Sequence, residues 1–368
     1  MRDRTTTASR QIAGRISAGL ALTFLLLAGP GCGSDAASGT TGASSASKRS
    51  SKNVHASAIK PTAAKDAGTD GAAPTSVSYD MLDAAQIGAP VKLALSKTLT
   101  LAEGPLWDPC EHRLLFVDVT ASVIYALGSD GELSEFMTDT KNANGIAFDP
   151  TDGSLVMAQM GGNPGHVMRR DKDGTVHQVD PDGSMLHTPD DVIVRSDGTI
   201  YFSDGEFPPI GSLNLSPLPV YEIPKDASML VNGGTVAGPN GIELSPDERT
   251  LYVDAYFGGQ VVEFDVASDG SLTKGDALVS GLASPDSLCL DAAGNLYVGV
   301  STGLQVLRPD GSKVALIPIG SPVTNCTFGD DDGKTLYITA WTNVWKVEGM
   351  PIPGLDFVAN TARLKCGA

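Results

Sequence analysis

The sequence is poor in aromatic residues, cysteine and basic charge. Aromatic residues make up 6% of its 368 residues, and 26 Lys and Arg stand against 43 Asp and Glu, with only 5 Cys. The resulting net charge of −17 argues against nucleic acid as a partner, because phosphate backbones bind basic surfaces. An acidic surface suits a cation or a neutral ligand, although solubility alone also explains it. No Gly-rich phosphate loop, Gly-x-Ser-x-Gly nucleophile motif or catalytic-triad arrangement is found.

The N-terminus has the pattern of a targeting signal. Four Arg within the first 15 residues precede a short apolar stretch at 16–29, which is too short for a good membrane span. The stretch "GPGC" then places Cys32 after small residues, as at a bacterial lipoprotein cleavage site, although Gly29 stands where Leu is usual. We therefore expect residues 1–31 to be a signal peptide. A lipidated Cys32 would anchor the protein in a bacterial membrane (periplasm or outer membrane), and ordinary secretion is the alternative. Either route predicts an extracytoplasmic protein.

The next segment has almost nothing to bury. Residues 33–78 are rich in Ser, Ala, Gly and Thr, which is typical of a flexible tether. The charge is uneven, because residues 1–31 carry +3 and residues 32–78 carry +2, which leaves −22 for the remainder. We predict a tether over residues 32–89, one folded domain over 90–350 and a C-terminal tail over 351–368.

One motif recurs along the whole predicted domain. Each copy starts with a polar residue, continues as an apolar strand, turns at Asp or Gly and returns as a "LYV"-type strand. The copies start at Glu103, Asn144, Asp190, Asn240, Asp286 and Asn325, at spacings of 41, 46, 50, 46 and 39 residues. Each spacing holds four short strands, and a second Asp-Gly hairpin follows most copies. Six such units predict an all-β, six-bladed propeller of four antiparallel strands per blade. A β-sandwich is the rival all-β fold, but it does not repeat at a near-fixed period.

The ends of the domain should close the ring, and the cysteines fall in two groups. Residues 91–95 ("VKLAL") are predicted to complete the last blade, whose third strand is "NVWKV" at 343–347. Cys110 and Cys366 are both peripheral, so we predict a disulfide that fastens the C-terminal tail to the first blade. Cys289 and Cys326 lie inside strands and are interpreted as small buried apolar side chains.

The polar residue that opens each motif is the main functional candidate. The first strand of a propeller blade lines the central channel, so equivalent positions face one another across it. These positions form an oxygen-only ring, which suits a hard cation such as Ca²⁺ and argues against zinc or copper because it contains no Cys or His. The alternative is that Asp and Asn here cap turns. The ring comprises Glu103, Asn144, Asp190, Asn240, Asp286 and Asn325, or Thr324 if the last register slips by one.

These motifs resemble the gluconolactonase, senescence-marker-protein (regucalcin-like) and luciferin-regenerating-enzyme family of six-bladed propellers. The resemblance is carried by "EGPLWD", "NGIAFD", "PDDVIVRSDGTIYFSD", "PNGIELSPDERTLYV", "PDSLCLDAAGNLYV" and "VTNCTFGDDDGKTLYIT". It implies a Ca²⁺, or a substitute such as Zn²⁺, Mn²⁺ or Mg²⁺, held by Glu103, Asn240 and Asp286. Asp190 lies at the position beside this metal, which in the family is a ligand or substrate contact. We predict that Asp190 joins Glu103, Asn240 and Asp286 as a fourth metal ligand, and that Asp191 anchors the strand start.

The sequence departs from the family pattern at three places. Asp190 replaces an Asn, Ser287 replaces the Gly of "PDG", and "FSDGEFP" at 202–208 replaces "FTDPPYG". The additional carboxylate of Asp190 should tighten cation binding while making the ion a weaker Lewis acid.

The resemblance implies a metal-dependent hydrolase of lactones or related esters. Asp190 or Asp286 could accept a proton, and Asn144, Asp190 and Asn325 are the candidate substrate contacts. His187 is a candidate proton shuttle or, alternatively, an exposed loop residue. The other function class is a non-enzymatic, surface-tethered propeller that binds a ligand or protein and keeps calcium for structure. We expect a monomer with a small-molecule substrate, no nucleic-acid partner and membrane contact only through Cys32.

Overall fold

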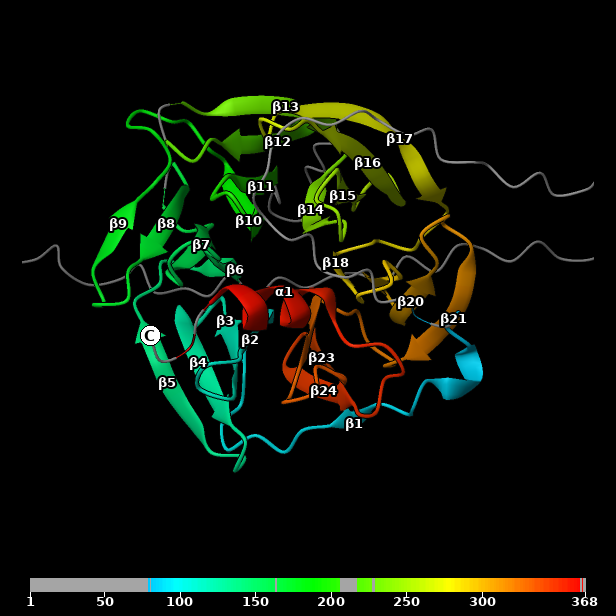
Figure 1. The fold of residues 1–368 in the computed structure, drawn as a ribbon. Helices are drawn as coiled ribbons and strands as arrows, with labels where there is room; N and C mark the ends of the chain where they lie inside the picture. Colours follow the sequence, from blue (N-terminus) through cyan, green and yellow to red (C-terminus); the bar gives the residue numbers. More distant parts are fainter. Residues whose placement is uncertain are drawn as a thin grey trace, which may run out of the picture. The chain divides into compact units, whose positions relative to one another are not determined.

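The computed structural model describes residues 79, 81–162, 164–205, 217–226, 229–364 and 366. The predicted signal peptide, Cys32 and most of the predicted tether lie outside these residues. The described chain forms six four-stranded antiparallel sheets (Figure 1). Each sheet is one blade, which confirms the six-bladed propeller.

The strands run in chain order through five blades, and the sixth contains both ends of the domain. Blade 1 comprises β2 (Ala102–Asp108), β3 (Arg113–Asp118), β4 (Val123–Gly128) and β5 (Leu133–Thr138). Blade 2 comprises β6 (Ala143–Phe148), β7 (Leu155–Gln159), β8 (His166–Arg170) and β9 (Val176–Gln178). Blade 3 comprises β10 (Thr188–Val194), β11 (Ile200–Gly205), β12 (Leu218–Ile223) and β13 (Val231–Val236). Blade 4 comprises β14 (Pro239–Leu244), β15 (Thr250–Ala255), β16 (Gln260–Val266) and β17 (Leu272–Ser280). Blade 5 comprises β18 (Ser287–Leu290), β19 (Leu296–Val300), β20 (Gly303–Leu307) and β21 (Lys313–Pro318). Blade 6 comprises β22 (Asn325–Gly329), β23 (Thr335–Ala340), β24 (Asn343–Val347) and β1 (Val91–Lys92).

The ring closes through the sixth blade, as the sequence predicted. Val91 of β1 pairs with Lys346 of β24 in an antiparallel ladder, and Leu93 N donates to Val344 O at 2.9 Å. Each first strand packs against the first strands of its two neighbours, and β22 packs against β2. The N-terminal strand thus covers an edge that would otherwise be exposed.

The apolar core lies between neighbouring blades. Tyr201 of blade 3 packs with Leu251 and Phe264 of blade 4, and all three side chains are fully buried. Trp107 of blade 1 stacks on Tyr337 of blade 6, with ring centroids 6.0 Å apart. These contacts fix the angle between blades and so hold the six first strands around the channel axis.

The C-terminal tail contains a helix that the sequence analysis did not predict. Helix α1 (Leu355–Arg363) lies over the centre of the ring of blades (Figure 1). A short 3-10 helix, η1 (Ala84–Gln86), precedes β1. Within the part of the chain that the structure describes, no helix is long and apolar enough to cross a membrane.

Two disulfides join distant parts of the chain. Cys110 and Cys366 are bonded, with Cα atoms 5.0 Å apart, which confirms the predicted link between the tail and blade 1. Cys289 and Cys326 are buried in the core, as predicted, and they also form a second disulfide between β18 and β22, which the sequence analysis did not predict. The two strands belong to neighbouring blades and bring the Cα atoms within 5.8 Å, a geometry that sequence spacing does not reveal.

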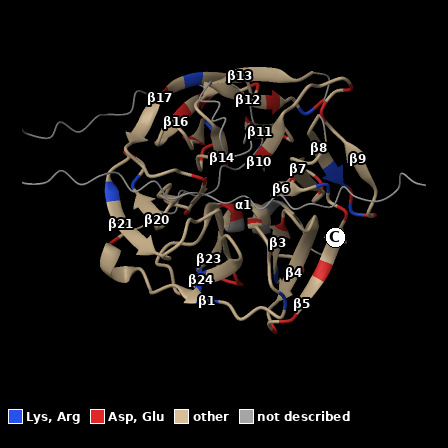
Figure 2. Cartoon of the chain, turned by 180° about the vertical axis from the view of Figure 1, so that it is seen from behind, with Lys and Arg blue, Asp and Glu red and all other residues tan. Residues whose placement is uncertain are grey.

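The acidic character of the chain is spread around the blades. Asp and Glu recur at strand ends and turns, whereas Lys and Arg are sparse and scattered over several blades (Figure 2). Many acidic side chains occupy turns, where they accept from nearby backbone amides; Asp197, for example, accepts from Thr199 N at 3.0 Å. The acidic residues at the channel are a separate group, because they are buried.

Candidate metal centre and active site

The first strands bulge at the level of the predicted ring. Register shifts interrupt the first ladder of blades 1 to 4, between Glu103 and Leu106, Ala143 and Ile146, Pro189 and Val192, and Pro239 and Ile242. A bulge turns a side chain away from the regular alternation of a strand. Each bulge coincides with the start of a sequence motif, so the motifs mark where the strands direct polar groups at the channel.

The structure brings four of the predicted ring residues together in two carboxylate–amide pairs. Asn144 Nδ2 donates to Asp190 Oδ1 at 2.8 Å, and Asn240 Nδ2 donates to Asp286 Oδ1 at 2.7 Å. Glu103 accepts from the Gly104 amide at 3.3 Å. Glu103, Asn144, Asp190 and Asn240 are all at most 6% exposed. Each amide uses its NH₂ on an Asp, so its carbonyl oxygen remains available as a cation ligand.

The buried carboxyls of the ring resist ionisation. Burial, followed by the charges of Asp286 and Asp190, raises the pKa of Glu103 well above its usual range. Burial also raises the pKa of Asp190 strongly, with Asp286 as the next cause. The pKa of Asp286 is raised to about 8, mainly by burial. A divalent cation would relieve this repulsion and compensate the lost hydration of the carboxylates.

The donor set fits a hard cation, because it combines carboxylate and amide oxygens from several blades. Among the described residues, no three His, Cys, Asp or Glu side chains form a ready-made metal cluster. Two of the ring carboxylates are paired with Asn instead. Glu103, Asn240 and Asp286 are the residues that would hold the ion, and Asp190 stands beside them.

Asp191 anchors the strand, as expected, and it also links three blades. Its carboxylate accepts from Val192 N at 3.0 Å, from Ile242 N at 3.4 Å and from Asn325 Nδ2 at 3.5 Å. Asn325 therefore points at Asp191 and is not placed with the ring pairs. Thr324, the other candidate for the sixth position, donates its hydroxyl to Ala102 O at 2.6 Å.

His187 is held by Asp204. Asp204 Oδ2 lies 3.1 Å from His187 Nδ1, and the carboxylate also accepts from His187 N at 2.9 Å. The Asp204 side chain is fully buried, while that of His187 is 48% exposed. The imidazole is thus fixed in place and still reaches solvent, which suits a proton-transfer role as well as a structural one.

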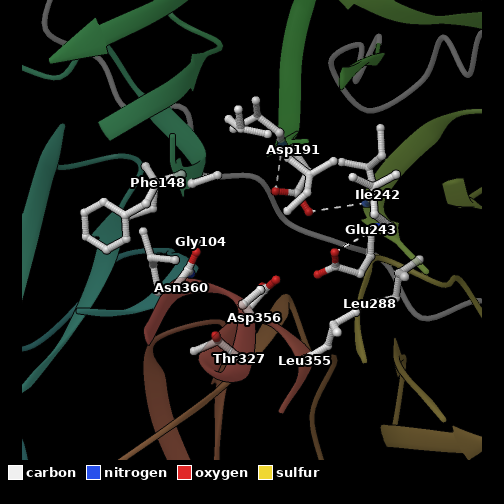
Figure 3. A pocket seen from close by; sticks show the side chains of 18 of the residues that line it. Gly104, Phe148, Asp191, Ile242, Glu243, Leu288, Thr327, Leu355, Asp356 and Asn360 are labelled. Atoms are coloured by element: carbon white, nitrogen blue, oxygen red, sulfur yellow. Dashed lines mark hydrogen bonds between the residues drawn. The ribbon is translucent and has the colours of Figure 1, made fainter. Parts of the chain in front are cut away.

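A cavity of about 80 Å³ lies farther along the same first strands, away from the ring and below helix α1. Figure 3 shows Asp191, Glu243 of β14 and Asp356 of α1 around it, together with apolar side chains. Glu243 accepts from Leu244 N at 2.8 Å, and burial and the neighbouring Asp356 raise its pKa well above its usual range. Sequence analysis did not find this second group of acids, because Asp356 lies outside the repeats.

The fold agrees with the comparisons to known proteins. Residues 101–342 match the family described as the SMP-30/gluconolactonase/LRE-like region. The chain belongs to this family. It is 28% identical over 299 residues to a gluconolactonase of Zymomonas mobilis, covering 71% of this chain and 82% of the relative. It is 27% identical over 257 residues to the lactonase drp35 of Staphylococcus saprophyticus, covering 67% of this chain and 76% of the relative. Among solved structures, a gluconolactonase of Xanthomonas campestris superposes with a TM-score of 0.62 at 29% identity, covering 72% of this chain and 89% of that one.

The departures from the family motifs are accommodated in different ways. Ser287 is fully buried and pairs with Gly299, and a side chain at position 299 would come within 2.9 Å of Ser287 Oγ. The missing side chain at Gly299 therefore makes room for the added hydroxyl. Asp190 is accommodated by the amide of Asn144. Residues 206–208 of the altered loop lie outside the described residues.

Two polar residues near the ring were missed from the sequence. Asp254 of β15 has an exposed fraction of 0%, and burial and then the charges of Asp286, Asp191 and Asp190 raise its pKa well above its usual range. Tyr256 lies two residues later, and burial and the charge of Asp286 raise its pKa to about 12. Asp254 lies in the second strand β15 and Tyr256 directly follows its end, whereas the sequence argument considered only the start of each first strand.

Proposed function

We propose that this protein is an extracytoplasmic, divalent-metal-dependent hydrolase of lactones, with Ca²⁺ as the resident ion and sugar lactones as the substrate class. The observation that carries the proposal is the ring of Glu103, Asn240 and Asp286, contributed by separate blades at the positions that the family motifs specify. The gluconolactonase and lactonase relatives support the choice of a lactone over other esters. The basic and apolar N-terminal segment ending at Cys32 supports membrane anchoring outside the cytoplasm.

The residues of the ring divide the chemistry between them. A bound divalent ion supplies electrophilic activation of a lactone carbonyl and lowers the pKa of a water. Glu103, Asn240 and Asp286 hold the ion, and Asn240 orients Asp286 through the 2.7 Å hydrogen bond. Asp190 or Asp286 could accept a proton from the water, and Asn144 fixes the orientation of Asp190 through the 2.8 Å hydrogen bond. His187 could exchange that proton with solvent, because Asp204 holds its ring at a half-exposed position.

The proposal is tested with a substrate panel. Gluconolactone and other sugar lactones, an aryl ester and a phosphotriester are offered to the purified protein after chelation and again after addition of Ca²⁺, Mn²⁺, Mg²⁺ or Zn²⁺. We expect lactone hydrolysis that disappears on chelation and returns with a divalent ion. Hydrolysis that ignores the chelator would contradict the metal dependence. A panel with no turnover at all would favour the binding-protein alternative, in which the ring holds a structural ion.

A further inference from the structure

Asp254 occupies a position at which the other blades carry no acid. In each of blades 1 to 4 one second-strand residue stands across from the ring residue at the bulge. By the strand registers, these residues are Val117, Ala158, Ser203 and Asp254. All four have an exposed fraction of 0%. The repeat therefore tolerates Val, Ala or Ser here, and packing alone does not require a carboxyl group.

The Asp254 carboxyl lacks hydrogen bonds like those of Ser203, the polar counterpart in blade 3. Ser203 accepts from Asp191 N at 3.1 Å and donates to Asn240 O at 2.5 Å. Neither carboxyl oxygen of Asp254 has a hydrogen bond of regular geometry within the described part of the chain; the Gly241 amide, which donates to Asp286 O at 3.1 Å, is a backbone donor near enough to lower the pKa of Asp254. A buried polar group without a partner costs free energy, and an isolated charge costs more. Such a group is usually retained for a reason other than stability.

The carboxyl also lies directly against the metal-binding strand. A side chain at Gly241 would come within 2.6 Å of Asp254 Oδ2 and within 2.4 Å of Ser287 Cα. Asp254 is therefore packed against the peptide that follows Asn240, next to the residue that follows Asp286. The charges of Asp286 and Asp190 act on Asp254, since both are among the causes of its raised pKa.

Asp191 is a buried acid with a structural role, and it serves as a comparison for Asp254. It too packs against a glycine, since a side chain at Gly145 would come within 2.1 Å of Asp191 Oδ1. Asp191, however, accepts from three donors, and its pKa is raised only to about 7. Asp254 is at least as buried and has no such set of donors, so its carboxyl either stays protonated or has its charge compensated by a nearby cation.

We propose that Asp254 belongs to the cation site, as a carboxylate behind Asn240 and Asp286 whose negative charge strengthens binding of the ion. The inference rests on the proposed function and adds a residue that the resemblance does not assign. It makes Asp254 a positioning residue for the ion, not a group that contacts the substrate.

The test is a calorimetric titration of the chelator-stripped protein with Ca²⁺, which does not depend on activity. Asp254→Asn removes the charge with little change in shape, and Asp254→Ser copies the residue that blade 3 carries at the same position. We expect both variants to weaken calcium binding about tenfold or more, because each removes a buried negative charge next to the residues that hold the divalent ion. Thermal unfolding of the chelated variants checks that each one is folded.

Asp291→Asn is the matched control. Asp291 also has an exposed fraction of 0%, but four hydrogen bonds from Ala293, Asn295 and Tyr297 satisfy its carboxylate in the β18–β19 turn. This variant should lose stability yet keep the calcium dissociation constant within about twofold, since the turn lies away from the ring. An unchanged dissociation constant in Asp254→Asn or Asp254→Ser would overturn the inference and leave the proposed function intact. A wild-type protein that neither binds a divalent ion nor hydrolyses lactones would instead remove the proposed function itself.

Discussion

The two acidic groups along the channel differ in how their carboxyls are satisfied. At the ring, Asp190 and Asp286 each receive one amide hydrogen from an Asn of a neighbouring blade, and Asp254 has no hydrogen bond of regular geometry within the described residues. At the other end, Asp191 has three donors and Glu243 is paired with Asp356 of α1. Both groups are buried, so burial alone does not distinguish them. We infer that the ring is the group suited to bind a cation. The acids below α1 already have partners within the protein.

The largest expected effect comes from replacing one buried glutamate of a first strand at each end of the channel. Glu103→Gln should lower kcat/KM for lactone hydrolysis by about 1,000-fold or more, roughly 4 kcal/mol of transition-state stabilisation, because it removes a carboxylate from the ion. Glu243→Gln is the matched control, since it changes a buried Glu of another first strand whose pKa is also raised. We expect it to keep activity within about threefold. Steady-state kinetics on both variants measure the difference. Equal losses of kcat/KM would contradict the claim that the ring, and not the acids below α1, serves catalysis.

Removal of the tail disulfide should affect stability and leave the ring intact. The Cys110–Cys366 bond spans 256 residues, so it restricts the unfolded chain strongly. A Cys110→Ser/Cys366→Ser variant should lose about 2–4 kcal/mol of unfolding free energy by the usual effect of a disulfide. Urea unfolding of the calcium-loaded protein measures the loss. Turnover should stay close to that of the wild type, and a large loss of activity would show that the tail shapes the site.

Asp190→Asn restores the family residue at the ring. It should weaken calcium binding about tenfold, because one carboxylate fewer faces the ion, and it should retain or raise kcat, because a less neutralised ion is a better electrophile. Calorimetry and steady-state kinetics on the same preparation separate the two effects. If the variant is inactive while calcium stays bound, Asp190 and not Asp286 is the general base, and the expectation that kcat is retained or raised is wrong.

The smallest expected effect is a pH dependence of stability in the chelated protein. Asp191 and Asp286 have folded-state pKa values of about 7 and about 8, above the usual unfolded value near 4. Between these values the folded state binds more protons than the unfolded state, so unfolding free energy falls as pH rises from about 4 to about 8. The melting temperature after chelation should therefore be lower at pH 8 than at pH 5. Excess calcium should flatten this slope through Asp286, and a slope that calcium leaves unchanged would place the titrating acids away from the ring.

The sequence was most informative where the same motif recurred, because six weak copies together identify a fold that one copy does not. Six copies of one motif predicted the propeller, the closure of blade 6 and the polar residues at each bulge. Asn325 shows the limit of that reasoning, because the β22–β23 ladder has no bulge and the Asn325 side chain donates to Asp191. Asp254 was missed because "LYVDA" looks like an ordinary strand, and its oddity emerges only when the registers align it with Val117, Ala158 and Ser203. The Cys289–Cys326 bond and helix α1 depend on contacts between blades and on the tail, for which the repeat contains no signal.

The central claim is that the ring, and not the acids below α1, binds the ion. It is tested most directly by a crystal structure determined with millimolar calcium, or with manganese for its stronger anomalous signal. The account predicts one ion bound to Glu103, Asn240 and Asp286, with no ion between Glu243 and Asp356. An ion-free ring at that concentration, or an ion held by Glu243 and Asp356 instead, would contradict it.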